Sequence, residues 1–263
     1  MRPSTGTGGI LYPAAATTAF ELTRFEPGPA LAPYVERHWV VRWSVADSFV
    51  QPMVAHPCVN LTIEPERAAV HGVVTRRASK ALEGAGRVVA TKFRPGAFRP
   101  FWGRSVHELN DRAVDLEQVF GPAASVLASD VRACPGDADA VALLEDFLVA
   151  RLPEPDPAMM MVVEAARVVL EDTELTRVTD LAARMGVSPR RLQRQFREYV
   201  GIGPKLMIRR ARIHRAAAIL SAGGSVDLAG LALDLGYADQ AHFAHDFRAE
   251  VGCAPNGYRR ACG

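Results

Sequence analysis

Two histidines and two aspartates lie close together near the C-terminal end of the chain, in the stretch GYADQAHFAHDF (236–247). His242 and His245 are three residues apart, a spacing that puts both side chains on one face of a helix. Their imidazole nitrogens and the carboxylates of Asp239 and Asp246 could together hold a metal ion. The same face could equally contact a macromolecule, so the elements that carry these residues decide between the two readings.

An internal repeat explains this stretch. Residues 181–204 and 231–255 both begin with Leu-Ala, have Gly five residues after the Leu, and end in F-R-x-x-V-G-x-x-P. Gly186 and Gly236 can supply the positive φ that a tight helix–helix turn requires. Asp239 falls at a helix N-cap, where backbone amides occupy its carboxylate. The repeat therefore predicts two helix-turn-helix units and no metal site.

The second helix of the first unit is predicted to present an arginine-rich face. Leu192 and Phe196 are four residues apart and are expected to face inward. Arg and Gln are the side chains that pair bidentately with guanine and adenine edges in the major groove. This helix is therefore expected to be a DNA recognition helix, and its unit to place on the DNA side Ser188, Arg190, Arg191, Gln193, Arg194, Arg197 and Lys205.

Charge is concentrated in the same region. The whole chain has a formal net charge of +2, but residues 175–215 hold 11 basic and only 2 acidic groups. Such an excess is the electrostatic footprint of a polyanion site, although a solvated helix face gives the same count. Residues 216–263 hold 3 basic and 5 acidic groups. We therefore expect the first unit to supply most of the DNA affinity and the second to adjust specificity.

Residues 175–260 resemble the DNA-binding domain of the AraC/XylS family of transcription regulators. The resemblance runs through LAxxxGxSxxxLxRxF, then PxxMIxxxRIxxA from Pro204, and GYADQAHFAHDFRAEVGCAPNGYRR. It implies an all-α, homeodomain-like domain of seven helices that binds double-stranded promoter DNA and works with RNA polymerase. By position it assigns base reading to Arg190, Gln193 and Arg194, and in the second unit to Gln240, Ala241 and His245, where the family usually has Arg at the last position. The second unit is expected to place on the DNA side Asp239, Gln240, Ala241, His242, His245 and Arg248.

The residue pattern of the N-terminal half predicts a β-rich barrel or sandwich with helices. In residues 37–45 Trp39, Val41, Trp43 and Val45 alternate with mostly polar residues, the pattern of a half-buried strand. Further strand candidates lie at 58–65, 70–75 and 86–96, short helical turns follow from about 105 to 120, and a helix is expected over 137–152. The sequence thus predicts an α+β chain with domains 1–152 and 158–263, separated by the rigid, polar linker PEPDP at 153–157.

Residues 93–121, with HPCVNLTIEP upstream, resemble an uncharacterised, cupin-like N-terminal domain of one branch of the same family. No general ligand goes with that resemblance. The aromatic side chains could line an apolar effector pocket, or they could simply form the core. The candidate effector-binding residues are Trp39, Trp43, His56, Asn60, Arg94 and Trp102.

Enzymatic signatures are weak. His38, His56, His71 and His107 form no H-x-H pair, and no G-x-S-x-G or P-loop occurs. The spacing of Cys58, Cys134, Cys253 and Cys262 suits neither a zinc cluster nor a disulfide framework, so reduced thiols are expected. We expect no catalytic residue and no cofactor. Two alternatives stay open: an enzyme, such as a repair protein, with an appended DNA-binding domain, or an N-terminal half that binds only a protein partner.

Cellular location follows from two features. No window approaches the 18 consecutive apolar residues that a membrane helix needs, and the opening residues MRPSTGTGGILYPAAATTAF lack the pattern of a signal peptide. A cytoplasmic protein without membrane contact is expected. The amphipathic segments 137–152 and 158–171 are candidate surfaces for a homodimer or for contact between the domains.

Overall fold

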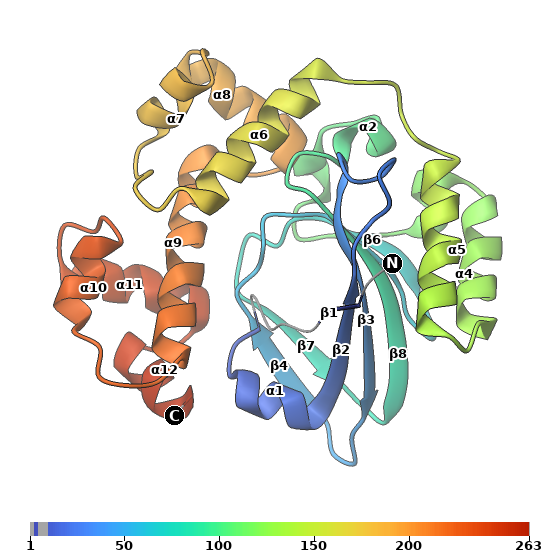
Figure 1. The fold of residues 1–263 in the computed structure, drawn as a ribbon, viewed down its shortest axis with the longest axis horizontal. Helices are drawn as coiled ribbons and strands as arrows, with labels where there is room; N and C mark the ends of the chain where they lie inside the picture. Colours follow the sequence, from blue (N-terminus) through green and yellow to red (C-terminus); the bar gives the residue numbers. More distant parts are fainter. Residues whose placement is uncertain (1–2, 5–9, 263) are drawn as a thin grey trace.

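The computed structural model describes residues 3–4 and 10–262 of the chain. A β-rich N-terminal half and an all-helical C-terminal half lie side by side, which confirms the expected fold class (Figure 1). Residues 1–2 and 5–9 of the opening stretch, on which the expectation about a signal peptide rests, fall outside the described part. Within that part, no helix is both long and apolar enough to cross a membrane.

The N-terminal half is built on a seven-stranded antiparallel sheet with the order β1-β2-β3-β8-β5-β6-β9, and a second sheet pairs β4 with β7. The strands of the large sheet are β1 (Pro3–Ser4), β2 (Phe20–Phe25), β3 (Val35–Ser44), β5 (Asn60–Ile63), β6 (Ala68–His71), β8 (Ala85–Phe93) and β9 (Ala113–Asp115). The small sheet consists of β4 (Phe49–Met53) and β7 (Ala78–Leu82). β9 falls where only helical turns were expected.

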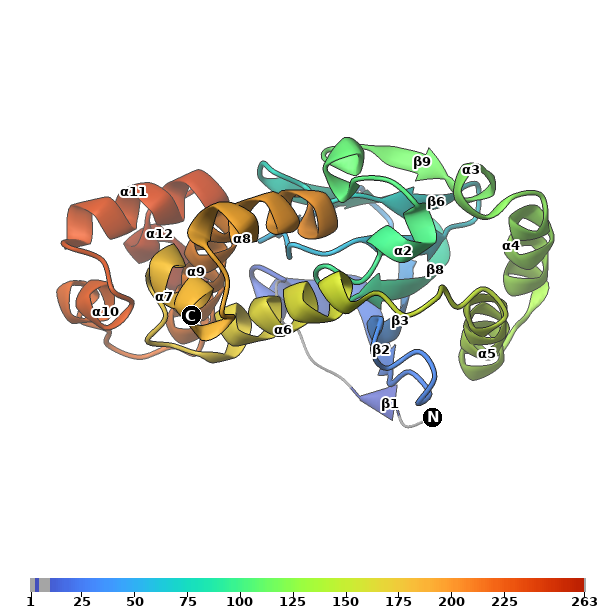
Figure 2. The same ribbon diagram turned by 90° about the horizontal axis from the view of Figure 1, so that it is seen from above.

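Helices cover one face of the large sheet (Figures 1 and 2). α4 (Ala123–Ala133) and α5 (Asp137–Val149) pack on β3, β5 and β8. Shorter elements are α1 (Pro13–Ala19), α2 (Arg99–Trp102), the 3₁₀ turn η1 (Val106–Leu109) and α3 (Leu116–Phe120). The helix expected over 137–152 ends at Val149, three residues earlier than predicted, and Leu152 is exposed.

Strand β3 shows that both faces of the sheet are covered. The alternation in the sequence indicated Trp39 and Trp43 on the buried side and His38 on the polar side. In the structure His38 and Val40 are the buried residues, facing the helices, and His38 Nδ1 lies 2.8 Å from Thr91 Oγ1. The tryptophans are half-buried on the opposite face. The predicted core side was wrong because alternation cannot rank two covered faces of one strand.

The C-terminal half contains the two expected helix-turn-helix units. Its helices are α6 (Pro157–Glu171), α7 (Val178–Arg184), α8 (Pro189–Gln195), α9 (Pro204–Ser221), α10 (Leu228–Asp234), α11 (Gln240–Val251) and α12 (Pro255–Cys262). A π-helical segment, η2 (Phe196–Val200), extends α8. The π turn has no counterpart in the second unit, and nothing in the sequence pattern predicted it.

The segment between the halves is anchored at its end. Asp156 caps α6 by accepting hydrogen bonds from the backbone amides of Ala158 and Met159, and it also accepts one from the Tyr199 hydroxyl at 2.9 Å. One continuous hydrophobic cluster extends from Phe25 in the sheet to Ala211 in α9. The two halves are therefore packed together, and the division at 153–157 stays a prediction from sequence.

Candidate nucleic-acid interface

The first helix-turn-helix unit is formed by α7 and α8. Gly186 has φ 63°, and the amide of Val187 donates to the carbonyl of Ala182 at 3.0 Å, which closes the turn. Ser188 then caps α8, its hydroxyl accepting from the amide of Arg191 at 3.3 Å. The inward side chains, Leu192 and Phe196, are fully buried.

The second unit repeats this construction in α10 and α11. Gly236 has φ 73°, and the amide of Tyr237 donates to Ala232 at 2.9 Å, the counterpart of the first turn's bond. Asp239 caps α11 by accepting from the amide of His242 at 2.7 Å. Phe243 and Phe247 occupy the buried positions. The repeat in the sequence is thus a repeat of backbone geometry.

Both recognition helices, α8 and α11, keep the predicted polar side open. All the residues that the sequence assigned to the DNA side are exposed: Ser188, Arg190, Arg191, Gln193, Arg194, Arg197, Lys205, Asp239, Gln240, Ala241, His242, His245 and Arg248. Ser188 and Asp239 use their side chains as helix caps. An exposed row of Arg and Gln on a short amphipathic helix is suited to the edges of bases in the major groove.

α9 holds the two units apart and in register. It has 18 residues, so its axis is about 27 Å long, which is somewhat shorter than the roughly 34 Å between successive major-groove openings. Arg210 is fully buried and donates from Nε to Glu250 of α11 at 3.2 Å. Arg209 donates to the same carboxylate at 3.1 Å. These ion pairs fix α11 against α9 and so set the relative position of the two recognition helices.

The charge count of the sequence overstates the charge carried by the residues assigned to the DNA side. Five of the arginines in 175–215 are not among those residues and contact other groups of the protein. Arg184 pairs with Asp172, the guanidinium of Arg212 lies 3.6 Å from the ring centre of Tyr237, and Arg215 donates to carbonyls at the end of α6. The other two are Arg209 and Arg210. About half of the local positive charge therefore holds the fold together.

The two histidines of α11 have different surroundings. His245 is exposed on the outer side of the helix, at the position that Arg194 has in α8. His242 lies 3.9 Å from Asp246, whose side chain is nearly buried and also faces Arg209. The carboxylate of Asp239 is used in the cap. Across the described residues, no three His, Cys, Asp or Glu side chains are grouped as a metal would need.

Two family models match the chain. One is described as a helix-turn-helix domain and covers residues 181–261, which spans both units. The chain carries an AraC-type DNA-binding domain. The other model is a domain of unknown function, DUF6597, and covers residues 23–115, which is most of the sheet in front of the AraC-type domain. A search of curated proteins gave no match.

Solved structures similar to this chain include proteins with AraC-type domains. The C-terminal domain of AraT, a response regulator from Geobacillus stearothermophilus, is 25% identical and covers 41% of this chain and 87% of its own, with a TM-score of 0.36. An AraC-type transcriptional regulator from Chromobacterium violaceum is 26% identical over 39% of this chain and 92% of its own, with a TM-score of 0.36. ToxT from Vibrio cholerae is 13% identical over 93% and 98% of the two chains, with a TM-score of 0.41.

The sheet domain touches the first unit of the AraC-type domain beside its recognition helix. Arg197 donates from its guanidinium to His107 Nε2 at 3.0 Å. Because guanidinium only donates, this nitrogen of His107 accepts, and its Nδ1 carries the proton toward the carbonyl of Gly201, 3.0 Å away. Arg99 also pairs with Glu198 at 2.9 Å. Arg197, which the sequence assigned to the DNA side, thus also contacts the sheet domain. Sequence reasoning missed this contact between distant segments.

A cavity of about 400 Å³ lies between the open face of the large sheet and the β4–β7 sheet. Four of the six candidate effector residues line it: Trp39, Trp43, His56 and Asn60. The other two lie elsewhere. Arg94 donates to the carbonyl of Ala32 at 2.8 Å, and Trp102 packs at the edge of the core with Arg104 over its ring. The cluster around Phe93, Phe98 and Phe101 is core rather than cavity wall.

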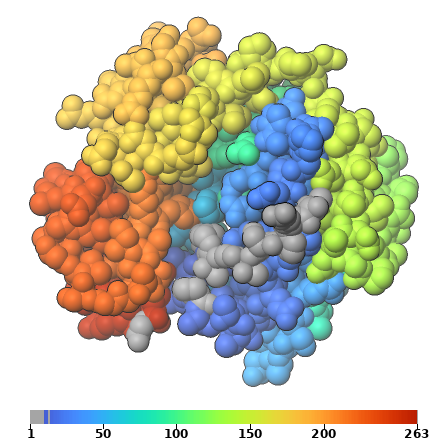
Figure 3. Space-filling view, in the orientation of Figure 1, coloured from blue at the N-terminus to red at the C-terminus, as the bar shows by residue number. Residues whose placement is uncertain are grey.

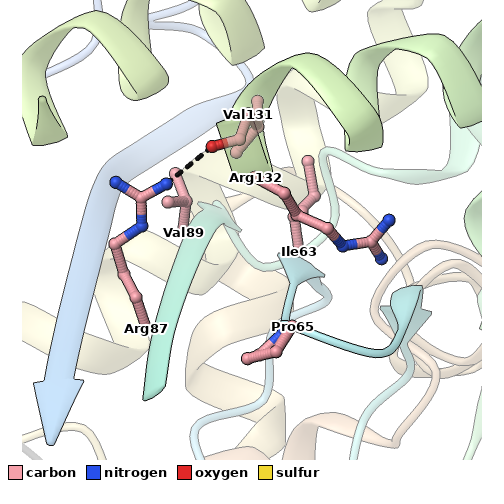
Figure 4. Close-up of a pocket in the computed structure, with 6 residues that line it drawn as sticks. All are labelled: Ile63, Pro65, Arg87, Val89, Val131 and Arg132. Carbon is pink, nitrogen blue, oxygen red and sulfur yellow. Dashed lines mark hydrogen bonds between the residues drawn. The ribbon is translucent and has the colours of Figure 1, made fainter. Parts of the chain in front are cut away.

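A smaller hollow of about 260 Å³ lies beside α4 (Figure 4). Arg87 donates to the carbonyl of Val131 at 2.6 Å, and Arg132 donates to the carbonyl of Glu64 at 2.9 Å. Both guanidinium groups thus make contacts that anchor α4 on the sheet. The larger cavity is therefore the better candidate for a ligand site.

Proposed function

We propose that the chain is a one-component transcription regulator that reads promoter DNA with α8 and α11 and is controlled by a small molecule in the cavity of the sheet domain. One observation supports the DNA-reading part of this proposal. The capped helices α8 and α11, which α9 links, both expose the polar side that the sequence predicted. Base reading is proposed for Arg190, Gln193 and Arg194 in α8. In α11 it is proposed for Gln240, Ala241 and His245.

The second half of the proposal is supported by contacts between the cavity wall and α9. His56 lines the cavity, and its ring stacks on His214 of α9 with 4.2 Å between ring centres. Burial lowers the pKa of His214 to about 4, so this stack is uncharged on the His214 side near neutral pH. Val74, also in the cavity wall, accepts a hydrogen bond from Arg210 at 2.5 Å. A ligand that moved either wall segment would act on the helix that spaces the two DNA-reading units.

Binding suits this cavity better than catalysis by its cysteine. Cys58 lines the cavity, and burial raises the pKa of its thiol. A protonated thiol is a poor nucleophile and a poor alkyl acceptor.

Contacts with RNA polymerase and with a second copy of the chain belong to the same proposal. Side chains such as Val126, Leu143 and Val149 on the outer faces of α4 and α5 are exposed and available to a partner.

DNA binding is tested with a duplex selected from random sequence by the full-length protein. Arg194→Ala should weaken binding by about 1–3 kcal/mol and relax the preference at one base pair. The matched control is Arg67→Ala, which removes the same charge from an exposed pair with Asp115 on the sheet domain and should leave binding unchanged. Binding by Arg194→Ala that equals the wild type would count against α8 as the reading helix.

The division of labour between the units has its own test. His245→Ala should alter base preference with little loss of affinity, because the second unit has few basic groups and its affinity for phosphate is expected to be small. Arg194→Ala should lose affinity most at low salt. Comparing the two variants at two salt concentrations decides the matter, and equal losses in both variants at both concentrations would contradict the asymmetry.

A further inference from the structure

The floor of the cavity has an apolar end. Strand register places Phe20 opposite Trp43, and Leu22 opposite Val41, on the open face of the sheet. Trp43 in turn lies over Gly86 of β8, where an added Cβ would be only 2.3 Å from the indole ring. The indole therefore covers a bare stretch of backbone. Aromatic and aliphatic carbon forms the surface at this end.

The other end of the same floor carries cations from three adjacent strands. Arg24 lies two residues beyond Leu22 on β2, opposite Trp39. Arg37 lies opposite Lys92 in the register between β3 and β8, and all three cations line the cavity. Asn60 of β5 is the next partner of Lys92. The cavity thus changes from apolar to cationic along the strand direction.

The cations differ in how they are balanced. Glu36 pairs with Lys92, with 2.9 Å between Nζ and Oε2, and also with Arg37. Lys80, another cation in the wall, pairs with Glu64 at 2.7 Å. The guanidinium of Arg24, by contrast, has no hydrogen bond or ion pair with any residue in the described part of the chain. Burial and the nearby charge of Arg37 lower the pKa of Arg24, and the charge of Glu36, which is paired with Lys92 and Arg37, offsets only part of that effect.

We propose that the cavity binds an elongated amphipathic organic anion, with an aryl or alkyl body against the apolar end and one carboxylate-type head on Arg24. The inference rests on the proposed function, in which this cavity is the effector site. Four residue steps along β2 separate Phe20 from Arg24, a span of about 13 Å. The cavity volume of about 400 Å³ lies within the usual range of small-molecule sites. A partly buried guanidinium without a partner is stabilised most by an anion that accepts two hydrogen bonds.

The head-group end is also the end that leads to α9. Asn60 begins β5 and pairs with His71, the last residue of β6, at the level of Lys92. The segments that continue from there carry His56 on one side and Val74 on the other. Both of these wall residues contact α9. An anion bound at the cationic end would therefore lie nearest to the helix that positions α8 and α11.

Three probes with one tail test the head group: 6-phenylhexanoate, 6-phenylhexan-1-ol and 6-phenylhexylammonium. Binding to the full-length protein is measured by calorimetry at neutral pH. The acid should bind at least roughly tenfold more tightly than the alcohol, because a hydrogen bond to a charged group contributes about 1.5 kcal/mol or more. The ammonium should bind most weakly. Arg24→Met should remove the difference between acid and alcohol while leaving alcohol binding intact. Arg67→Met, which loses a cation outside the cavity, should behave as the wild type.

The outcomes separate this inference from the proposed function. Equal binding of acid and alcohol, tightest binding of the ammonium, or no binding of any probe would overturn the ligand class. An acid preference that survives in Arg24→Met, in a variant whose thermal unfolding matches the wild type, would also overturn it. Selective binding of the acid with no change in affinity for DNA would uphold the ligand class and contradict control through α9.

Discussion

The salt dependence of DNA binding follows from which cations are free. Each phosphate contact contributes about −0.9 to the slope of log K against log salt. The eleven basic groups of 175–215 would together give a slope of about −10. Five of these eleven groups are on the assigned DNA side, and Arg248 of α11 is a sixth cation there. Six cations give a slope of about −5 if all meet phosphate and a shallower one if some meet only bases. Those six are Arg190, Arg191, Arg194, Arg197, Lys205 and Arg248.

Fluorescence anisotropy with a labelled duplex measures this slope between about 50 and 200 mM salt, over which affinity should fall on the order of 10³-fold. Arg191→Ala should make the slope shallower by about one. Arg184→Ala removes the same charge from the pair with Asp172 and should leave the slope unchanged. A slope near −10, or an equal effect of the two variants, would refute the division into free and structural arginines.

Two stability predictions follow from single groups. Burial lowers the pKa of His38 to about 4 from 6.5, so the folded state resists protonation, and stability present near pH 7 is lost as pH falls below 6.5. From these pKa values, the free energy of unfolding of the wild type should fall by about 2 kcal/mol between pH 7 and pH 5. In urea unfolding, His38→Gln should lose correspondingly less stability over the same pH range. A variant that loses as much stability as the wild type would contradict the assignment to His38. Asp239→Ala removes the cap of α11 and should cost about 1 kcal/mol in thermal unfolding, whereas Asp234→Ala, on the exposed side of α10, should cost almost nothing.

The C-terminal domain could be predicted because its signals are local. The turn glycines, the caps and the inward pairs four residues apart each act within one turn of helix. What the sequence could not show is how each arginine is used. Arg210 and Arg194 look alike along the chain, but one is buried against Glu250 and the other is exposed. That difference arises from the packing of α9 against α11, which no local pattern contains.

The sheet domain was harder to predict for a related reason. Strand positions followed from alternation, but the roles of the two faces did not, and His38 was assigned to the wrong side. The cavity depends on the register that brings Arg24, Arg37 and Lys92 to one end of three neighbouring strands. Register is a property of the assembled sheet. The contact between His107 and Arg197 is equally remote from any sequence motif.

Hydroxyl-radical footprinting of the full-length protein on its selected duplex tests most directly whether α8 and α11 read DNA together. We predict two protected patches on one face of the duplex, with centres about 10 base pairs apart, because the proposed function has α8 and α11 enter successive major grooves. Arg194→Ala should weaken protection of one patch more than the other. A single patch, or two patches on opposite faces, would contradict a bipartite reader.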